Sequence, residues 1–169
     1  AYVFPGGKVD DRDAAPGLLR HLDRSPEALH AELHEADIDD TTAASLYVAA
    51  IREAFEESGI LLAEGARHAQ AIAARALLHE GLDFEHVLSR LSLHLHTEQV
   101  TPWSRWITPK VPTVTNKRFD TRFFVSGVPS DQVAVHDNHE ATESLWITPR
   151  AALQRYWQRT RHAIVLRYT

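Results

Sequence analysis

The chain has 169 residues, of which 44% are hydrophobic and 24% charged, a balance typical of one folded domain with its own core. A net charge of −5 excludes an overall basic field for duplex nucleic acid, and the absence of cysteine excludes disulfides and cysteine zinc sites. No apolar run approaches the roughly 18 residues that span a bilayer, so we expect no membrane segment and a cytoplasmic location. The sequence has no methionine and begins inside a strand-like run, so we expect a single domain over residues 1–169 whose N-terminal part is missing.

The first third of the chain predicts a strand, a loop and two helices. Residues 2–4 form a short β-type run that ends at Pro5-Gly6-Gly7, where two glycines allow close approach of another group. A polar helical insertion is predicted at about residues 14–43, with a helix that starts at Ser25-Pro26. The next helix is predicted from the caps near Asp40 to the stop at Gly59.

The remaining chain predicts paired helices and then β-structure. Helical spacing predicts helices at 66–80 and 83–95, and β-type runs bounded by prolines predict strands at 104–108, 118–125 and 143–147. A last helix is predicted from Pro149 to about Ala163. The order of elements therefore predicts an α+β fold.

The helix that ends at Gly59 carries apolar and acidic residues on opposite faces. At about 100° per residue, the apolar stripe holds Ala44, Tyr47, Val48, Ile51 and Phe55, and the acidic face holds Glu53, Glu56 and Glu57. A solvated acidic face is the ordinary interpretation of such a helix. Here the carboxylates repel one another at spacings of three and four and oppose the helix dipole, each effect costing roughly a few tenths of a kcal/mol. A hard cation, Mg²⁺ or Mn²⁺, would offset that repulsion.

Gly6-Gly7 and the run Arg52-Glu53-Ala54-Phe55-Glu56-Glu57-Ser58-Gly59-Ile60 together resemble the Nudix box, a loop–helix–loop motif. The run matches the second half of the box residue by residue except at Ala54, where the family has a bulky aliphatic residue. In the first half, Asp13 stands where the family has Glu. Residues 14–51 then separate Asp13 from Arg52, where the family has only seven residues, so the box carries a long insertion.

An interrupted box of this kind is similar to that of the coenzyme A and acyl-coenzyme A diphosphatases of the Nudix superfamily. The segments 4–10, 50–57 and 118–124 carry this resemblance. The resemblance implies the Nudix fold, an α/β/α sandwich with a mixed β-sheet flanked by helices and, in this chain, extra helical insertions.

The same resemblance implies a catalytic site. Glu53, Glu56 and Glu57 would bind the metal, with Asp13 as the weakest candidate ligand, and Arg52 would hold the carboxylates in position. Glu53, Arg52 and Glu57 would thus serve the attack of a metal-activated water on a diphosphate phosphorus. The base that accepts the proton is left open among Glu53, Glu140 and Glu143.

Four residues are candidates for substrate binding. Gly6 and Gly7 offer backbone atoms, and Arg118 and Arg122 lie on the polar face of the strand predicted at 118–125. For the two arginines, cross-strand salt bridges are an equally good interpretation. An apolar trough for a pantetheine arm is expected from Leu18, Leu19, Leu22, Leu88 and Leu91.

The function expected is therefore Mg²⁺-dependent (or Mn²⁺-dependent) cleavage of a diphosphate linkage in a nucleoside diphosphate derivative, with coenzyme A or acyl-coenzyme A as candidates. Two alternatives stay open: an ADP-ribose or NDP-sugar pyrophosphatase, and a catalytically weak Nudix-fold module that binds a nucleotide or a protein. The expected partner is a small molecule, without duplex nucleic acid or membrane, and a homodimer is one candidate oligomeric state.

Overall fold

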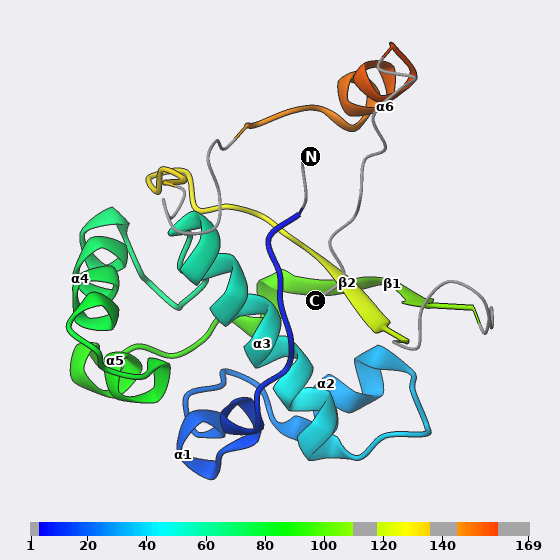
Figure 1. Cartoon of the computed structure of the whole chain (residues 1–169). Helices are drawn as coiled ribbons and strands as arrows, with labels where there is room; N and C mark the ends of the chain where they lie inside the picture. Colours follow the sequence, from blue (N-terminus) through cyan, green and yellow to red (C-terminus); the bar gives the residue numbers. More distant parts are fainter. Residues whose placement is uncertain (1–3, 110–117, 136–144, 159–169) are drawn as a thin grey trace.

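The computed structural model describes residues 4–109, 118–135 and 145–158. Its elements are η1 (Asp11–Ala14), α1 (Pro16–Leu19), α2 (Pro26–Leu33), α3 (Asp40–Ser58), α4 (His68–His79), α5 (Phe84–Leu91), η2 (Thr97–Gln99), β1 (Val100–Ile107), β2 (Asp120–Ser126) and α6 (Pro149–Gln158). Helix α3 crosses the middle of the molecule, with α1 and α2 near one end and α4 and α5 beside the other (Figure 1). Helices and a small antiparallel sheet confirm the α+β class.

Helix α3 begins and ends where its capping residues predict. The Asp39 carboxylate accepts a hydrogen bond from Thr42 N at 2.7 Å. At the other end, Gly59 adopts the left-handed conformation with φ 71° and donates its N–H to Phe55 O at 2.8 Å. The insertion helix α2 starts as predicted, with Ser25 as the N-cap and Pro26 in the first turn.

The core forms around the apolar face of α3. The predicted stripe is confirmed, because Ala44, Tyr47, Val48, Ile51 and Phe55 are each at most 1% exposed. Burial of one such large side chain stabilises the fold by about 1.5–3 kcal/mol. The partners of this face come from the insertion, the loop after α3 and helix α5, with buried residues Leu18, Leu29, Ile60, Leu61, Phe84, Val87 and Leu88.

Helix α5 ends earlier than predicted, at Leu91 instead of Leu95. Ser92 takes the left-handed conformation with φ 52° and closes the helix. The chain then extends, and Leu95 pairs in parallel with Leu22 and antiparallel with Ala63. The apolar spacing at the end of the predicted helix therefore reflects buried extended chain rather than a further helical turn.

The sheet in the described residues contains β1 and β2, paired antiparallel from Val100 with Ser126 to Ile107 with Asp120. β1 starts at Val100, before the strand predicted at 104–108, and it includes Pro102. A bulge between Pro102 and Ser104 interrupts the ladder, which lets the strand accommodate a proline.

The strand predicted at 143–147 is wrong for the part that the structure describes. Residues 145–147 have no regular structure, and Trp146 is 72% exposed. Among the residues that the structure describes, no strand pairs with this run to receive its backbone hydrogen bonds. Glu143 and Ser144 lie outside the described residues, as do residues 2 and 3 of the first predicted strand and the end of the last helix beyond 158.

Ion pairs join the insertion to the hairpin of β1 and β2. Glu35, in the loop between α2 and α3, contacts Arg105 at 2.8 Å and Arg122 at 2.6 Å. Asp120 contacts the same two arginines at 2.7 and 3.0 Å. Since Tyr47 also packs on Phe124 with ring centroids 4.9 Å apart, helix α3 and the hairpin are held by both apolar and ionic contacts.

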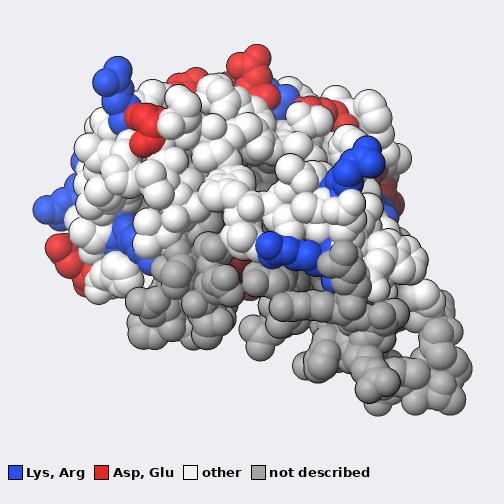
Figure 2. Space-filling model, turned by 90° about the horizontal axis from the view of Figure 1, so that it is seen from above, with Lys and Arg blue, Asp and Glu red and all other residues white. Residues whose placement is uncertain are grey.

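Across the described ranges, no helix has the length and apolar character needed to cross a membrane. Figure 2 shows the Lys and Arg side chains of one face in small separate groups, some of them beside Asp and Glu side chains.

Candidate active site

The acidic face of α3 lies against the glycine loop at the start of the chain. The segment that contains Gly6 and Gly7 runs across α3 in Figure 1, and Gly6 N donates a hydrogen bond to Glu57 Oε2 at 3.2 Å. A Cβ added at Gly7 would lie 2.3 Å from the carboxylate carbon of Glu53. The loop therefore approaches the helix as closely as glycine permits, although the insertion separates the two in sequence.

Arg52 lies at the centre of this arrangement. Its guanidinium binds Asp13 through two bonds, Nε to Oδ1 at 2.8 Å and Nη2 to Oδ2 at 3.0 Å. It also contacts Glu53 Oε1 at 2.8 Å and Glu56 Oε2 at 3.1 Å, and it donates to Lys8 O at 3.1 Å. One side chain thus fixes the glycine loop, the insertion and two carboxylates of the acidic face.

Asp13 is placed to orient Arg52. It is 1% exposed and accepts a further hydrogen bond from Asp10 N at 2.8 Å, as part of the capping box of η1. Both of its oxygens are therefore engaged inside the protein, Oδ1 by Arg52 and Oδ2 by Arg52 and Asp10 N. The Asp13 side chain is shorter than the Glu found at this place in the Nudix box, and it reaches Arg52 because η1 brings the backbone close. This geometry does not favour a ligand role for Asp13.

The charges of the site influence each other's protonation. Burial lowers the pKa of Arg52, but its hydrogen bonds and charge contacts with Asp13, Glu53 and Glu56 outweigh this effect and raise the pKa above its usual range. Partial burial raises the pKa of Glu56, Arg52 opposes the rise and Glu53 adds to it. The face thus holds more negative charge than Arg52 alone neutralises.

The donor set of this face fits a hard divalent cation. Glu53, Glu56 and Glu57 supply carboxylate oxygens, which Mg²⁺ and Mn²⁺ prefer, and the loop at Gly7 brings backbone atoms within contact distance of Glu53. Glu56 retains 40% side-chain exposure and Glu53 16%, so solvent reaches the face at Glu56. These residues are the ones that would hold the metal.

The two candidate arginines have protein partners in the structure. Arg122 is 12% exposed and pairs with Glu35 and Asp120, so the ion-pair interpretation describes its contacts. Arg118 is exposed and its Nε donates to Thr108 O at 3.4 Å. A role of either in substrate binding stays a prediction. The candidate bases Glu140 and Glu143 lie outside the described residues.

The leucines expected to line an apolar trough belong to the core instead. Leu18 and Leu88 are 3% and 0% exposed, and Leu19, Leu22 and Leu91 pack partly buried against the same core. The expectation of a trough at these residues is therefore wrong. The sequence shows that these residues are apolar, but it does not distinguish a ligand-binding surface from internal packing.

Two residues that contact the chain at or beyond the end of α3 were not identified from the sequence. Arg75 of α4 lies next to Gly59, with Nη1 3.2 Å from the position of a Cβ there. Gln132 is buried and hydrogen-bonded to the loop after α3. Each joins elements far apart in the chain, and no local pattern marks such contacts.

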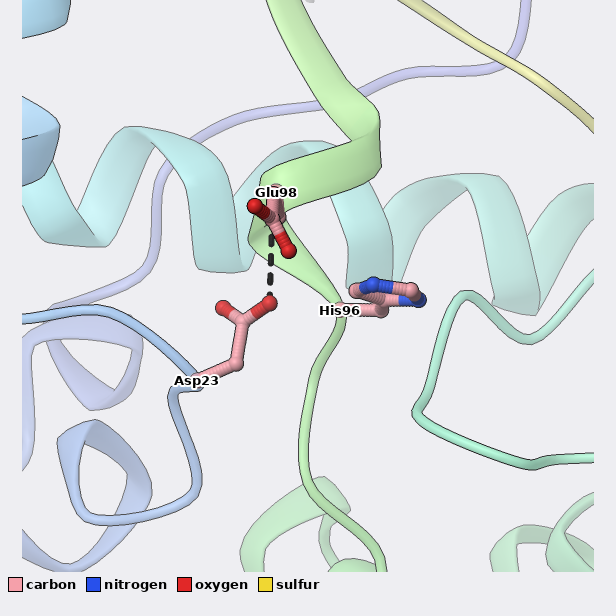
Figure 3. A group of neighbouring side chains, drawn as sticks. All are labelled: Asp23, His96 and Glu98. Carbon is pink, nitrogen blue, oxygen red and sulfur yellow. Dashed lines mark hydrogen bonds between the residues drawn. The ribbon is translucent and has the colours of Figure 1, made fainter.

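A separate group, Asp23, His96 and Glu98, places potential ligand atoms within 4.8 Å of one another (Figure 3). Asp23 already accepts hydrogen bonds from Thr97 N at 2.9 Å, from the Thr97 hydroxyl and from Glu98 N at 3.1 Å. A carboxylate offers about four acceptor positions, and hydrogen bonds from Thr97 and Glu98 already use three of those of Asp23. Asp23 therefore acts mainly as a cap for η2. The fold explains this group without a metal.

Comparison with known proteins agrees with the geometry. The family model described as the NUDT19 Nudix domain matches residues 34–163. The chain is 26% identical to the acyl-coenzyme A diphosphatase NUDT19 of Xenopus laevis, covering 92% of this chain and 50% of that protein. It is 27% identical to the protein of that name from Gallus gallus, covering 92% of this chain and 52% of that protein.

A crystal structure of a Nudix hydrolase from Alicyclobacillus acidocaldarius is similar, with a TM-score of 0.66 and 29% identity over 92% of this chain and 67% of that one. The chain spans about half the length of the NUDT19 relatives. The family match, the solved structure and the loop–helix arrangement agree, and the chain belongs to the Nudix family as a domain of the NUDT19 type.

Proposed function

We propose that the chain is a Mg²⁺-dependent hydrolase that cleaves the diphosphate linkage of a nucleoside diphosphate derivative, with coenzyme A or acyl-coenzyme A as the substrate. The observation that carries the proposal is the placement of Arg52 between Asp13 and the acidic face. Arg52 contacts Glu53 and Glu56 at 2.8 and 3.1 Å while Gly6 N reaches Glu57 at 3.2 Å. A module that only binds a ligand has no need for three mutually repelling carboxylates fixed in this way.

In this proposal each residue has a definite task. Glu53, Glu56 and Glu57 hold Mg²⁺ or Mn²⁺, which when bound neutralises phosphate charge and acidifies water. Arg52 keeps Glu53 and Glu56 in their rotamers, because its own position is fixed by two bonds to buried Asp13. Glu53, Glu140 or Glu143 takes the proton from the attacking water. The backbone at Gly6 and Gly7 borders the reacting diphosphate.

The substrate class rests on the relatives. The frog and chicken proteins are named acyl-coenzyme A diphosphatases, and the matched family model carries the NUDT19 name. Coenzyme A carries a 3′-phosphate that needs a cation outside the metal site. Exposed Arg118 is the better candidate for that contact, since Arg122 would first have to leave Glu35.

The proposal also includes the domain organisation, the partner, the location and the oligomeric state of the protein. Residues 1–169 form a single domain, the partner is a small molecule and the location is cytoplasmic, which the lack of cysteine is compatible with. A homodimer stays a prediction for the oligomeric state.

The test compares kcat/KM for coenzyme A, acetyl-coenzyme A, ADP-ribose and ATP at one Mg²⁺ concentration. The proposal predicts the highest kcat/KM for one of the two coenzyme A compounds, with release of adenosine 3′,5′-bisphosphate. A clear preference for ADP-ribose would reject coenzyme A and acyl-coenzyme A as the substrate, but it would still support diphosphate cleavage as the reaction. Binding without turnover of any of the four would favour the binding module instead.

A further inference from the structure

The hairpin of β1 and β2 turns one of its faces toward the body of the protein. On this face Phe124 stacks on Tyr47 of α3, and Arg122 pairs with Glu35 of the insertion. Because side chains alternate along a strand, the odd-numbered residues of β2 project from the opposite face, which we call the outer face. These residues are Thr121, Phe123 and Val125.

The register of the hairpin extends the outer face onto β1. Trp106 is paired with Thr121, and the bulge after Pro102 places both Trp103 and Ser104 opposite Phe123. Trp103 is 75% exposed and Trp106 is 58% exposed. The outer face therefore presents two large aromatic side chains to solvent.

The outer face carries no charged side chain. It consists of Trp103, Ser104, Trp106, Thr121, Phe123 and Val125. A sheet face that meets only water is normally polar, and proteins protect exposed strands with charged residues such as lysine. An exposed apolar patch on a folded protein marks a surface that associates with another apolar surface.

Helix α6 is the segment of the same chain that offers a second exposed apolar surface. Its Leu153 and Tyr156 lie three positions apart, on one side of the helix, and both are exposed. Figure 1 shows α6 apart from the hairpin, so the chain's own helix leaves the outer face open. A second molecule is the occupant that remains for this face.

The size of the outer face suits contact with an identical copy. A tryptophan side chain contributes up to about 250 Å², so the exposed parts of Trp103 and Trp106 amount to about 330 Å² in each copy. Two copies would bury about 660 Å² of this apolar surface. Since about 65% of a homodimer interface is apolar, the whole contact would reach about 1,000 Å², which is sufficient for a specific interface.

We propose that the outer face of the hairpin is a dimer interface, at which two copies of the chain pack sheet against sheet about a twofold axis. In such an interface the same patch lies on both sides, so the two tryptophans of each copy meet apolar partners and no charge is buried. Two antiparallel sheets pack face to face about 10 Å apart, with their side chains interdigitated. The inference does not depend on the proposed hydrolysis.

Sedimentation equilibrium of the 169-residue chain measures the Kd of the dimer. We expect a reversible monomer–dimer equilibrium with a Kd in the micromolar range. Trp106→Glu places like charges on both sides of the interface and should raise the Kd at least about 30-fold. Trp146→Glu is the matched control, because Trp146 is also exposed but lies outside the hairpin, and it should keep the wild-type Kd.

A wild-type chain that stays monomeric at about 1 mM overturns the proposal. So does a dimer whose Kd is unchanged by Trp106→Glu, or is raised equally by Trp146→Glu, since the contact would then lie elsewhere. Circular dichroism verifies that each variant is folded. If Trp106→Glu does not fold, Trp103→Glu, at the more exposed position, is held to the same criteria.

Hydroxyl-radical footprinting identifies what covers the outer face. In the proposed dimer, oxidation of Trp103 and Trp106 falls as the protein concentration rises through the Kd, while oxidation of Trp146 and Tyr156 does not change. Protection of Trp103, Trp106 and Tyr156 together at every concentration would show that α6 covers the outer face within one chain, and it would overturn the proposal.

Discussion

Asp13 and Arg52 lie 39 positions apart and form a two-point ion pair, with Arg52 Nε 2.8 Å from one carboxylate oxygen and Nη2 3.0 Å from the other. The helical insertion lies between them in sequence. Because loop-closure entropy grows only slowly with loop length, the inserted residues add little to the free energy needed to bring the two side chains together. The pair thus closes the loop–helix motif in spite of the interruption.

Asp13→Asn should lower the free energy of unfolding by about 3 kcal/mol, because it leaves the largely buried Arg52 without its main countercharge. Urea denaturation measures this change. Asp11→Asn is the matched control, since it makes the same exchange at an exposed position of the same short helix and should stay within about 0.5 kcal/mol of wild type. Equal stability of the two variants would show that the ion pair does not hold the motif together.

Glu57→Gln keeps the size of the side chain and removes its charge from the proposed metal site. We expect kcat with Mg²⁺ to fall by about 100-fold and the Mg²⁺ requirement to rise. Glu64→Gln, at an exposed residue of the loop after α3, should behave as wild type. Near-normal turnover of Glu57→Gln would remove Glu57 from the metal ligands.

Gly7→Ala tests the close approach of the loop to the acidic face. The added methyl would lie 2.3 Å from the Glu53 carboxylate, which has to move away, and this displacement should lower kcat/KM by about 100-fold. The melting temperature should change little, because the end of the Glu53 side chain can rotate. Gly127→Ala is the control, as a Cβ there meets no atom within 4 Å. Full activity of Gly7→Ala would contradict the loop geometry.

His30 makes the attachment of α2 to α3 dependent on pH. Its Nδ1 lies 2.6 Å from Asp40 Oδ1 and its Nε2 2.8 Å from Glu35 O, so only the protonated ring donates to both acceptors. Both contacts raise the pKa of His30 above its usual value of about 6.5, and the hydrogen bond with Glu35 O has a larger effect than the one with Asp40. The stabilisation is therefore complete below the unfolded pKa and is lost as the pH rises through the folded pKa.

The melting temperatures of wild type and His30→Gln should accordingly differ more at pH 6 than at pH 9. Asp83 raises the pKa of His86 in the same direction, so His86→Gln serves as a second reference and should leave the contribution of His30 in place. A difference between wild type and His30→Gln that does not depend on pH would show that the ring is not protonated in the folded chain.

The sequence predicted those features that depend on local patterns. The caps and the 3.6-residue period located α3 and its buried stripe, and the Arg-Glu and Glu-Glu pairs located the acidic face. Contacts between distant segments leave no such pattern. The bonds of Gln132 to Leu61 span 71 positions, and the pairing of Leu95 with Leu22 replaced the last turn predicted for α5.

The most direct measurement of the central claim is a ³¹P NMR time course of coenzyme A with the chain and Mg²⁺, followed by a repeat in excess EDTA. The account predicts that the diphosphate resonances disappear and phosphomonoester resonances replace them with Mg²⁺ present, and that EDTA or Glu57→Gln preserves the diphosphate. Unchanged diphosphate resonances at stoichiometric enzyme with Mg²⁺, or equal cleavage in EDTA, would contradict it.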